Sequence, residues 1–449
     1  MELSKGKTQL LIVTICCVFV MSTVISGCID NGNNGVDSDG DGIYDSNDAF
    51  PNDPAASVDS DSDGLPDSWN EGKNESDSTT GLTIDPDPET PNYKSWTFMV
   101  YISDCDLEYF AITDINEMEA VGSSDNLNIV VQFDRWESNS DSDDTTNGDW
   151  TTAKRFYVTE DTNPYTIGSN ELADLGEINS GDPQELVKFV KWAKQAYPAD
   201  NYFLDIWNHG AGIEGVAYEQ SQDPYDVITI SELKSAMSSI TNEGSDKLDV
   251  IGFDACLMST IEVAQSMAPY ADYMVASEVT EPGTGWDYNF MSYLKQNPNM
   301  SPVELGKKIV STFVAQGSSN TQQTFMLSLL NLMEMETVLS DLDALSLSIQ
   351  NGGSDEYGVF QEALQYAQPV QEGLSSEAVD LYDFVKRIKA GTMDDTVKQE
   401  ATDLLSALDT FILYLEKRSG YQDINVDNAH GLSIYSPEFM LTYEYEEDK

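Results

Sequence analysis

Basic residues and histidines are scarce in this chain of 449 residues. It carries 22 Lys and Arg against 79 Asp and Glu, which gives a net charge of −57 at pH 7. Binding to a nucleic-acid backbone needs a basic face, so nucleic acid is excluded as a partner. The two histidines are His209 and His430. This excludes a His-rich metal centre, and we expect no organic cofactor.

The first 28 residues have the pattern of an export signal. Lys5 and Lys7 precede an apolar run at 10–21, which is too short to span a membrane. Ile25 and the small residues Ser26 and Gly27 then stand directly before Cys28. This ending resembles a lipobox, in which Cys28 becomes the lipidated mature N-terminus. Ordinary secretion with cleavage nearby is the alternative. We therefore expect an extracellular protein at the cell surface, anchored to the membrane by a lipid.

Cysteine is scarce as well. Cys16 and Cys17 leave with the signal, and Cys28 is the lipid candidate, so only Cys105 and Cys256 remain. Two cysteines do not form a disulfide scaffold in an exported protein of this size. A free thiol in such a protein calls for a function, and a catalytic nucleophile is one candidate.

Residues 29–92 hold 17 acidic residues and one basic residue, and they are too poor in apolar side chains to fold by burial. Two loops in this segment, 37–48 and 59–70, carry carboxylates at positions 1, 3, 5 and 9 and a glycine at position 6. Ca²⁺ prefers six to eight oxygen ligands, and the glycine allows the sharp turn between them. The expected ligands are Asp37, Asp39, Asp41, Asp45, Asp48, Asp59, Asp61, Asp63 and Asp67.

No apolar helix flanks either loop, so these are not EF-hands. They resemble the calcium repeats of thrombospondin type 3, and the alternative is a disordered acidic spacer. We expect a structural Ca²⁺-binding stalk here.

From Trp96 onward the sequence is that of an α/β protein. Short apolar runs alternate with helical patterns, which predicts a mainly parallel sheet covered on both faces. This part is also acidic, with a net charge of −42 over 93–449, which suits a salt-rich habitat, basic substrates or simply a solvated surface. The expected strands are 96–102, 127–133, 202–207, 248–253, 273–277, 325–331 and 432–435, and the helices that precede residue 300 are 106–121, 184–197, 231–240 and 257–268.

Reactive side chains follow two of these strands. His209 comes shortly after strand 202–207, and Cys256 comes shortly after strand 248–253. The carboxyl ends of parallel strands lie at one edge of an open α/β sheet, and active sites of this fold class are usually found at that edge. His430 precedes its strand, so we expect it at the opposite edge.

Cys256 is the better candidate for a reactive thiol. Cys105 is followed by Asp106 and Glu108, whose charges disfavour a thiolate, whereas the helix expected from 257 has a dipole that favours one at Cys256. A buried cysteine is more often a small apolar residue. The paired strand ends nevertheless favour a His209–Cys256 dyad.

At these residues the chain resembles the clostripain family of clan CD cysteine peptidases, which are related in fold to caspases and legumains. The resemblance covers most of 94–437 and implies a caspase-like, mainly parallel sheet flanked by helices and preceded by the acidic stalk. The matching stretches are WTFMVYISDCDLE (96–108), INEME (115–119), NYFLDIWNHGAG (201–212), KLDVIGFDACLMSTIEVA (247–264), ASEVTEPGTGWDY (276–288) and HGLSIYSP (430–437).

The resemblance also implies a role for each site residue. His209 would be the general base, Cys256 the nucleophile, and the backbone at Gly210 and Cys256 the oxyanion site. Asp254 would line the S1 pocket and pair with Arg or Lys at the cleavage site of a protein or peptide substrate. Its alternative role is the N-cap of the helix that follows.

Four segments follow from this interpretation. They are a signal peptide with lipobox (1–28), the calcium-repeat stalk (29–92), a caspase-like catalytic core (93–300) and a helical part that completes the peptidase domain (301–449).

We therefore expect a surface-anchored cysteine endopeptidase that cleaves after Arg or Lys. Enzymes of the family can also hold calcium in the catalytic domain. Many of them cut themselves after a basic residue between the His and Cys strands, but residues 210–233 contain no Lys or Arg. The rival hypothesis is a non-catalytic, calcium-stiffened surface lipoprotein that uses the fold as a binding module.

Overall fold

The structure, a computed structural model, describes residues 36–436 except 62, 86–87, 90–92, 137–144, 222, 371–377 and 422. The expected signal peptide and Cys28 lie outside the described residues. Within the part that is described, no helix combines the length and the apolar character needed to cross a membrane.

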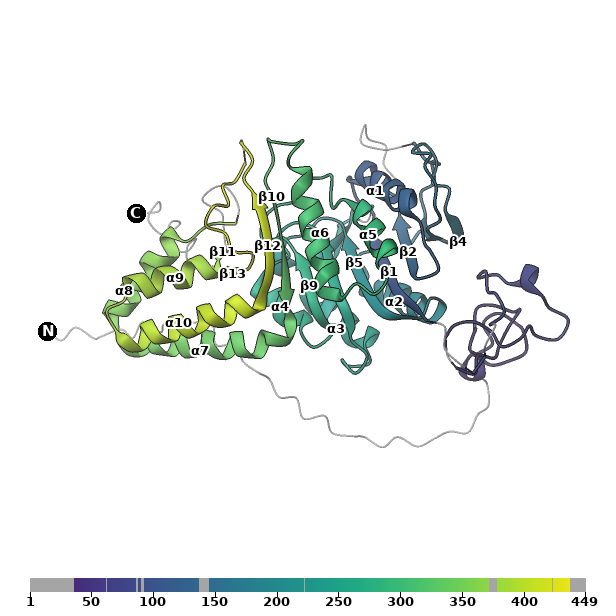
Figure 1. The fold of residues 1–449 in the computed structure, drawn as a ribbon, viewed down its shortest axis with the longest axis horizontal. Helices are drawn as coiled ribbons and strands as arrows, with labels where there is room; N and C mark the ends of the chain where they lie inside the picture. Colours follow the sequence, from purple (N-terminus) through teal and green to yellow (C-terminus); the bar gives the residue numbers. More distant parts are fainter. Residues whose placement is uncertain are drawn as a thin grey trace.

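A nine-stranded sheet forms the centre of the described chain (Figure 1). Its strand order is β12-β10-β9-β8-β5-β1-β2-β3-β4, and the five strands from β9 to β2 run parallel. The strands of this sheet are β1 (Lys94–Ile102), β2 (Leu127–Asp134), β3 (Ala153–Tyr157), β4 (Asn170–Gly176), β5 (Ala199–Trp207), β8 (Leu248–Asp254), β9 (Ala271–Ala276), β10 (Phe325–Asn331) and β12 (Ile412–Arg418).

The parallel strands form because their sequences are nearly continuous apolar runs, which need cover on both faces. All eight residues of β2 are buried, and so are the last seven of β1. Helices supply the cover on the two faces. The helices are α1 (Glu108–Val121), α2 (Pro183–Ala196), α3 (Ile230–Ile240), α4 (Ile261–Met267), α5 (Met291–Gln296), α6 (Pro302–Gln316), α7 (Met335–Gly352), α8 (Ser354–Tyr366), α9 (Leu381–Gly391) and α10 (Asp395–Phe411).

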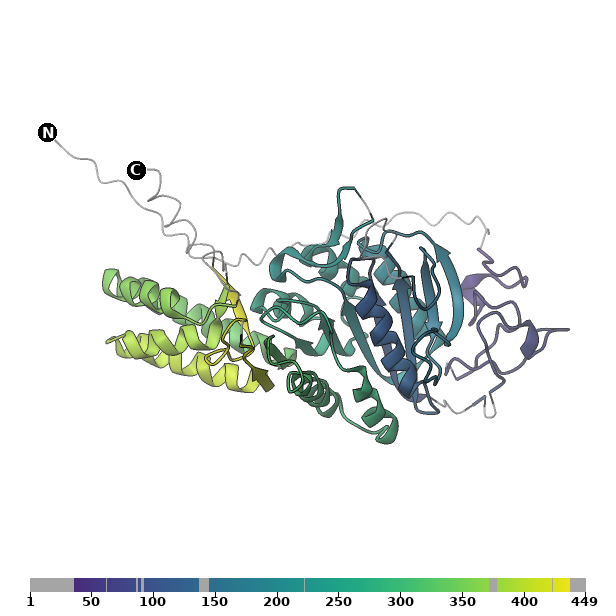
Figure 2. The ribbon, with the colours of Figure 1, turned by 90° about the horizontal axis from the view of Figure 1, so that it is seen from above.

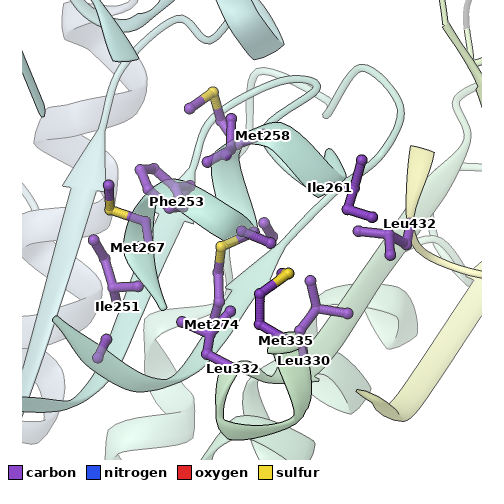
Figure 3. Packing of buried hydrophobic residues seen from close by; sticks show 14 of the residues in the cluster. Ile251, Phe253, Met258, Ile261, Met267, Met274, Leu330, Leu332, Met335 and Leu432 are labelled. Carbon is purple, nitrogen blue, oxygen red and sulfur yellow. The ribbon is translucent and has the colours of Figure 1, made fainter. Parts of the chain in front are cut away.

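Two hydrophobic clusters divide the core between the faces of the sheet. One contains side chains of α2, α3 and α4 and continues into α7, α9 and α10, whereas the other contains side chains of α1, α5 and α6. Figure 3 shows part of the first cluster, where Met258, Met274 and Met335 lie among Ile251, Phe253 and other aliphatic side chains. This packing supports the strand ends that carry the candidate site.

The C-terminal helices α7 to α10 extend beyond the end of the sheet (Figure 2). Strand β12 then returns from α10 and pairs antiparallel with β10, so the last part of the chain completes the central sheet. Two small sheets lie outside it. They are formed by β6 (Val216–Glu219) with β7 (Asp226–Ile228), and by β11 (Ala378–Asp380) with β13 (Ser433–Tyr435).

The predicted fold class is confirmed. The antiparallel strands β3 and β4 were not predicted, because their sequences are alternating or charged. Strand β12 was not predicted either, because its short apolar run directly continues the helical pattern of α10. The strand predicted at 432–435 exists as β13 but pairs with β11 instead of entering the main sheet.

The stalk was expected to bury no apolar side chains, but it contains a small hydrophobic cluster. Phe50, Ala56 and Leu82 form a small buried cluster. The stalk also contacts the peptidase domain, since the Gln195 side-chain amide donates to the Ala49 carbonyl at 3.2 Å. It lies beside α2 in Figure 1.

Candidate active site

Strands β5 and β8 are parallel neighbours, and Trp207 is in register with Asp254. The backbone N–H of Asn208 also donates to the Asp254 carbonyl at 3.3 Å. His209 and Cys256 therefore leave the sheet at the same edge, as the sequence predicts.

Gly210 lies directly against the backbone of Cys256. A Cβ added at Gly210 would come 2.3 Å from the Cys256 carbonyl oxygen and 3.1 Å from its nitrogen. Any larger residue would push these two chain segments apart. Glycine is therefore required for the close approach of the two strand ends.

The His209 ring is held by an acidic neighbour that sequence reasoning did not assign a role. Its Nε2 atom lies 2.8 Å from Asp106 Oδ1, and the Cys105 sulfur belongs to the same group, within 4.8 Å. An edge-on contact with the Tyr218 ring adds a second constraint. The thiol of Cys105 thus lies beside the His209 ring.

Cys256 is partly exposed, and its sulfur accepts the backbone N–H of Glu281 at 3.3 Å. Burial raises the pKa of the Cys256 thiol, and the Glu281 N–H acts in the opposite direction. Cys105 is 2% exposed, and burial together with the charge of Asp106 raises its pKa far more. Among the described residues, Cys256 and His209 do not share a hydrogen bond.

The helix after Cys256 begins later than predicted. Helix α4 starts at Ile261, and its N-cap is Thr260, whose side chain accepts the N–H of Val263. Leu257 has φ of 66°, and its N–H is bonded to the Val279 carbonyl, so the chain turns before the helix can begin. The predicted dipole effect on Cys256 is therefore wrong, and so is the N-cap role considered for Asp254.

Asp254 instead belongs to a buried group of carboxyls. It is 5% exposed, and its Oδ2 accepts the Trp286 N–H at 2.9 Å and the Tyr288 hydroxyl at 3.0 Å. The same hydroxyl lies 2.6 Å from the Asp205 carboxylate. Glu281 completes the group beside Asp254 and Cys256.

Burial raises the pKa of each carboxyl in this group, but not equally. It raises the pKa of Asp254 to about 6, against the lowering effect of hydrogen bonds from Trp286 and Tyr288. Burial and the charge of Asp254 raise the pKa values of Asp205 and Glu281 further. Burial therefore disfavours the negative charge on Asp254 less than on Asp205 and Glu281.

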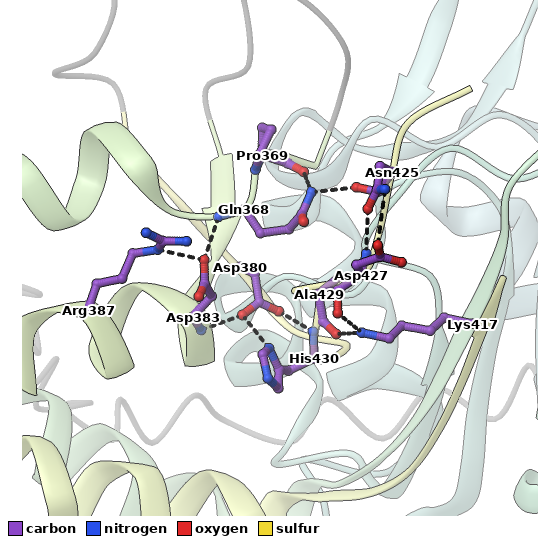
Figure 4. A network of polar contacts seen from close by, with 10 residues as sticks. All are labelled: Gln368, Pro369, Asp380, Asp383, Arg387, Lys417, Asn425, Asp427, Ala429 and His430. Carbon is purple, nitrogen blue, oxygen red and sulfur yellow. Dashed lines mark hydrogen bonds and ion pairs between the residues drawn. The ribbon is translucent and has the colours of Figure 1, made fainter. Parts of the chain in front are cut away.

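His430 lies in a different polar network, beside β11 and β13 (Figure 4). The prediction that it lies at the opposite edge of the sheet is wrong, because the carbonyl of the next residue, Gly431, accepts the hydroxyl of Ser259, which follows the strand end of Cys256. The Nδ1 atom of His430 is 3.1 Å from Asp380 Oδ1, and its ring stacks on Tyr382 with centroids 4.4 Å apart. Lys417 contributes to the same network through the Ala429 carbonyl. This environment gives His430 a structural role.

The stalk loops gather carboxylates as their sequence predicts. Oxygens of the first three aspartates of each loop lie within 4.8 Å of one another: Asp37, Asp39 and Asp41 in the first, and Asp59, Asp61 and Asp63 in the second. One oxygen each of Asp39, Asp48 and Asp61 is buried without a hydrogen-bond partner. Unpaired buried oxygens that converge in this way fit the ligand set of a hard cation.

The carboxylates at position 9 behave differently. Asp45 accepts the backbone N–H and the hydroxyl of Ser38, and Asp67 does the same with Ser60. These two residues close their loops by hydrogen bonds within the loop.

Comparison with known proteins agrees with this geometry. The model of the clostripain family matches residues 100–448. The chain belongs to the clostripain family. It is therefore a cysteine peptidase by family, and clostripain from Hathewaya histolytica is 25% identical over 398 residues, covering 76% of this chain and 74% of that protein.

The fold of this chain is also found in solved structures. An inactive zymogen C11 protease from Parabacteroides distasonis has a TM-score of 0.58 and 19% identity, with 80% of this chain and 97% of that chain covered. A secreted C11 cysteine protease from Bacteroides thetaiotaomicron in complex with an irreversible peptide inhibitor has a TM-score of 0.56 and 18% identity, covering 76% and 93%.

Replacing Gly210 with alanine tests the contact between the strand ends. The added methyl group collides with the Cys256 backbone, so we expect Gly210→Ala to lower kcat/KM by at least about tenfold, the effect of small misplacements at an active site. The measurement is hydrolysis of a fluorogenic peptide that the unaltered enzyme cleaves. Gly358→Ala is the matched control, because that glycine lies in α8 with no atom within 4 Å of the added methyl group. Equal activity of the two variants would contradict the assignment.

Proposed function

We propose that this protein is a surface-anchored cysteine endopeptidase that cleaves after Arg or Lys, with Cys256 as nucleophile and His209 as general base. The observation that carries the proposal is the parallel register of β5 and β8. It brings His209 and Cys256 to one edge of the sheet, with the carboxylate of Asp254 buried beside them.

The chemistry follows from these positions. Cys256 attacks the peptide carbonyl as a thiolate, while His209 accepts the thiol proton and later protonates the leaving amine. Backbone N–H groups at Gly210 and Cys256 hold the oxyanion, a contribution of roughly 2.7–4 kcal/mol per donor. Asp106 orients the His209 ring, and the Glu281 N–H supports the negative charge on sulfur.

Cys105 is the rival nucleophile, because its sulfur lies near the His209 ring. Two observations favour Cys256. Cys105 is almost fully buried, so a substrate carbonyl cannot reach it, and the charges nearest to it are those of Asp106, Asp104 and Glu219. A thiolate at Cys105 would be repelled by all three.

Specificity for Arg or Lys is supported by the buried carboxyl group around Asp254. A basic side chain beside Asp254 would pair with the carboxylate of the group whose negative charge burial disfavours least. Trp286 and Tyr288 hold that carboxylate in place before a substrate arrives. A fixed, desolvated carboxylate of this kind discriminates strongly between charged and neutral side chains.

Calcium in the stalk is supported by the convergent aspartates of both loops. The ion would neutralise carboxylates that otherwise repel one another, and it would make the segment between anchor and enzyme compact. Export and lipid anchoring rest on the first 28 residues. Export is also in keeping with the C11 protease from Bacteroides thetaiotaomicron, which is a secreted enzyme.

The first test separates the two cysteines and the two histidines. Cys256→Ala and His209→Ala are expected to lower kcat by at least about 10³-fold, because each removes a reacting group. Cys105→Ser and His430→Ala are the matched controls, and we expect them to keep most of the activity. An active Cys256→Ala enzyme would contradict this mechanism, and so would a Cys105→Ser enzyme that is folded but inactive.

The second test concerns the cleavage site. In Asp254→Asn, kcat/KM for a substrate with Arg at P1 is expected to fall by about 10²-fold, since a buried charge loses its partner. The value for Gln at P1 serves as the internal control and should barely change. Because the pKa of Asp254 is about 6 in the free enzyme, the Arg/Gln ratio should fall as the pH drops through 6. Equal kcat/KM values for Arg and Gln in the unaltered enzyme would refute the pocket.

The third test concerns the stalk. Calorimetric titration of the full chain with millimolar Ca²⁺ should show binding that weakens in the double variant Asp39→Asn/Asp61→Asn, because each substitution removes a central ligand. Asp45→Asn is the control, since Asp45 bonds to Ser38 in its own loop. Peptidase activity should be the same in the double variant. Unchanged binding in the double variant would remove calcium from these loops.

A further inference from the structure

A cavity of about 350 Å³ lies beside the two catalytic segments. One wall is the chain that follows His209, residues 211–214, and another is Leu257, which follows Cys256. The two walls touch, since a Cβ added at Gly212 would come 3.3 Å from the Leu257 carbonyl oxygen. The cavity therefore begins where the two catalytic side chains leave the sheet.

The cavity and the pocket proposed around Asp254 lie on different sides of the Cys256 segment. Asp254 bonds to Trp286 and Tyr288, which belong to the hydrophobic cluster of α1, α5 and α6. Thr260 lines the cavity and is the N-cap of α4, whose side chains belong to the other cluster. A substrate whose P1 side chain reaches Asp254 therefore presents a different residue to the cavity.

The position of the general base indicates which residue that is. His209 protonates the amine that leaves, so the peptide that follows the cleaved bond starts beside His209. Residues 211–214 continue from His209 and form one wall of the cavity. The first residues after the cleaved bond, P1′ and P2′, therefore run along this wall, whereas the P1 side chain runs toward Asp254.

A buried glutamate also lines the cavity. Glu278 follows β9 and is 1% exposed. On one side of it, the Val279 carbonyl accepts the Leu257 N–H at 3.1 Å. On the other side, the Ser277 carbonyl accepts the Ser259 N–H at 2.8 Å. Glu278 is thus held next to the chain that follows the nucleophile.

The carboxyl of Glu278 has unused hydrogen-bonding capacity. Neither of its oxygens has a hydrogen-bond partner among the described residues, although the Asp380 carboxyl and the Gly431 backbone lie nearby. Burial, followed by the charge of Asp380, raises the pKa of Glu278 well above its usual range, and the charge of Lys417 acts in the opposite direction. A buried carboxyl without a partner costs free energy, which a cationic N–H donor of a ligand would offset.

We propose that this cavity is a subsite for the residues that follow the cleaved bond and that it takes a basic side chain, Lys or Arg, at P1′ or P2′. The inference rests on the proposed function, because it needs a peptide bound at Cys256. Ile213 and Leu257 would contact the aliphatic part of that side chain. Its charge would lie between the buried Glu278 and the exposed Glu214.

The same cavity should reject an acidic side chain. None of the described residues that line it is basic, so an Asp or Glu of the substrate would meet two carboxyl groups and no cation. Rejection of the wrong charge and attraction of the right one both contribute to specificity.

The experiment uses the full exported chain and internally quenched peptides. All peptides share the P1 residue that the unaltered enzyme cleaves best, and they carry Lys, Ala or Asp at P1′ and at P2′ in turn. At one of the two positions, kcat/KM for Lys should exceed that for Ala by about tenfold, and Asp should give less than Ala. Equal values for Lys and Ala at both positions would overturn the proposal. If no peptide is cleaved at all, the proposed function itself fails.

Substitution then locates the subsite. Glu278→Gln should lower the Lys/Ala ratio by at least about fivefold, because a carboxyl that pairs with the basic side chain has gone. The change should appear mainly in KM, since Glu278 binds substrate without touching the reacting atoms. Glu214→Ala is the second variant if the first does not fold.

Glu362→Gln is the matched control, because Glu362 is exposed on α8 and does not line the cavity. This variant should keep the Lys/Ala ratio of the unaltered enzyme. A Lys/Ala ratio in Glu278→Gln, or in Glu214→Ala where that variant is used, equal to the ratio in Glu362→Gln would overturn the assignment of the subsite.

Discussion

The candidate site depends above all on the parallel pairing of β5 with β8. A displacement of one strand by a single residue would turn every side chain on it to the other face. His209 would then be separated from Cys256, and Asp254 from the tryptophan and tyrosine that hold it. The register is strongly fixed because both strands are buried on both faces, and because Gly210 lets the two chain segments touch just beyond their ends.

The shortage of basic residues determines how buried carboxylates are stabilised elsewhere in the protein. With 22 basic residues against 79 acidic ones, most buried carboxylates cannot be paired with Lys or Arg. The fold compensates some of them with N–H and O–H donors, as Trp286 and Tyr288 do for Asp254. Where no such donor is paired, as at Asp134, burial raises the pKa of the carboxyl to about 9 and so favours its protonated form.

Much of the fold could be predicted from sequence, because buried parallel strands such as β1 and β8 are continuous apolar runs with an unambiguous signal. The edge strand β12 could not, because its short apolar run directly continues the helical pattern of α10. In the site, the positions of His209 and Cys256 followed from the strand ends. The partners Asp106 and Glu281 did not, because their roles arise from contacts between segments that are distant in sequence. The start of α4 was placed too early because the turn at Leu257 has no glycine or proline to mark it.

The return of the chain from α10 into β12 has a consequence for folding. Strand β10 at 325–331 receives its outer neighbour only from 412–418, and β1 pairs with β5 across about a hundred residues of chain. Contacts between such distant segments make folding slow, because long loops must close before the contacts stabilise anything. A chain delivered from its N-terminus stays without a complete sheet until nearly all of it has emerged. The order of synthesis thus postpones completion of the central sheet until residues 412–418 are available to pair with β10.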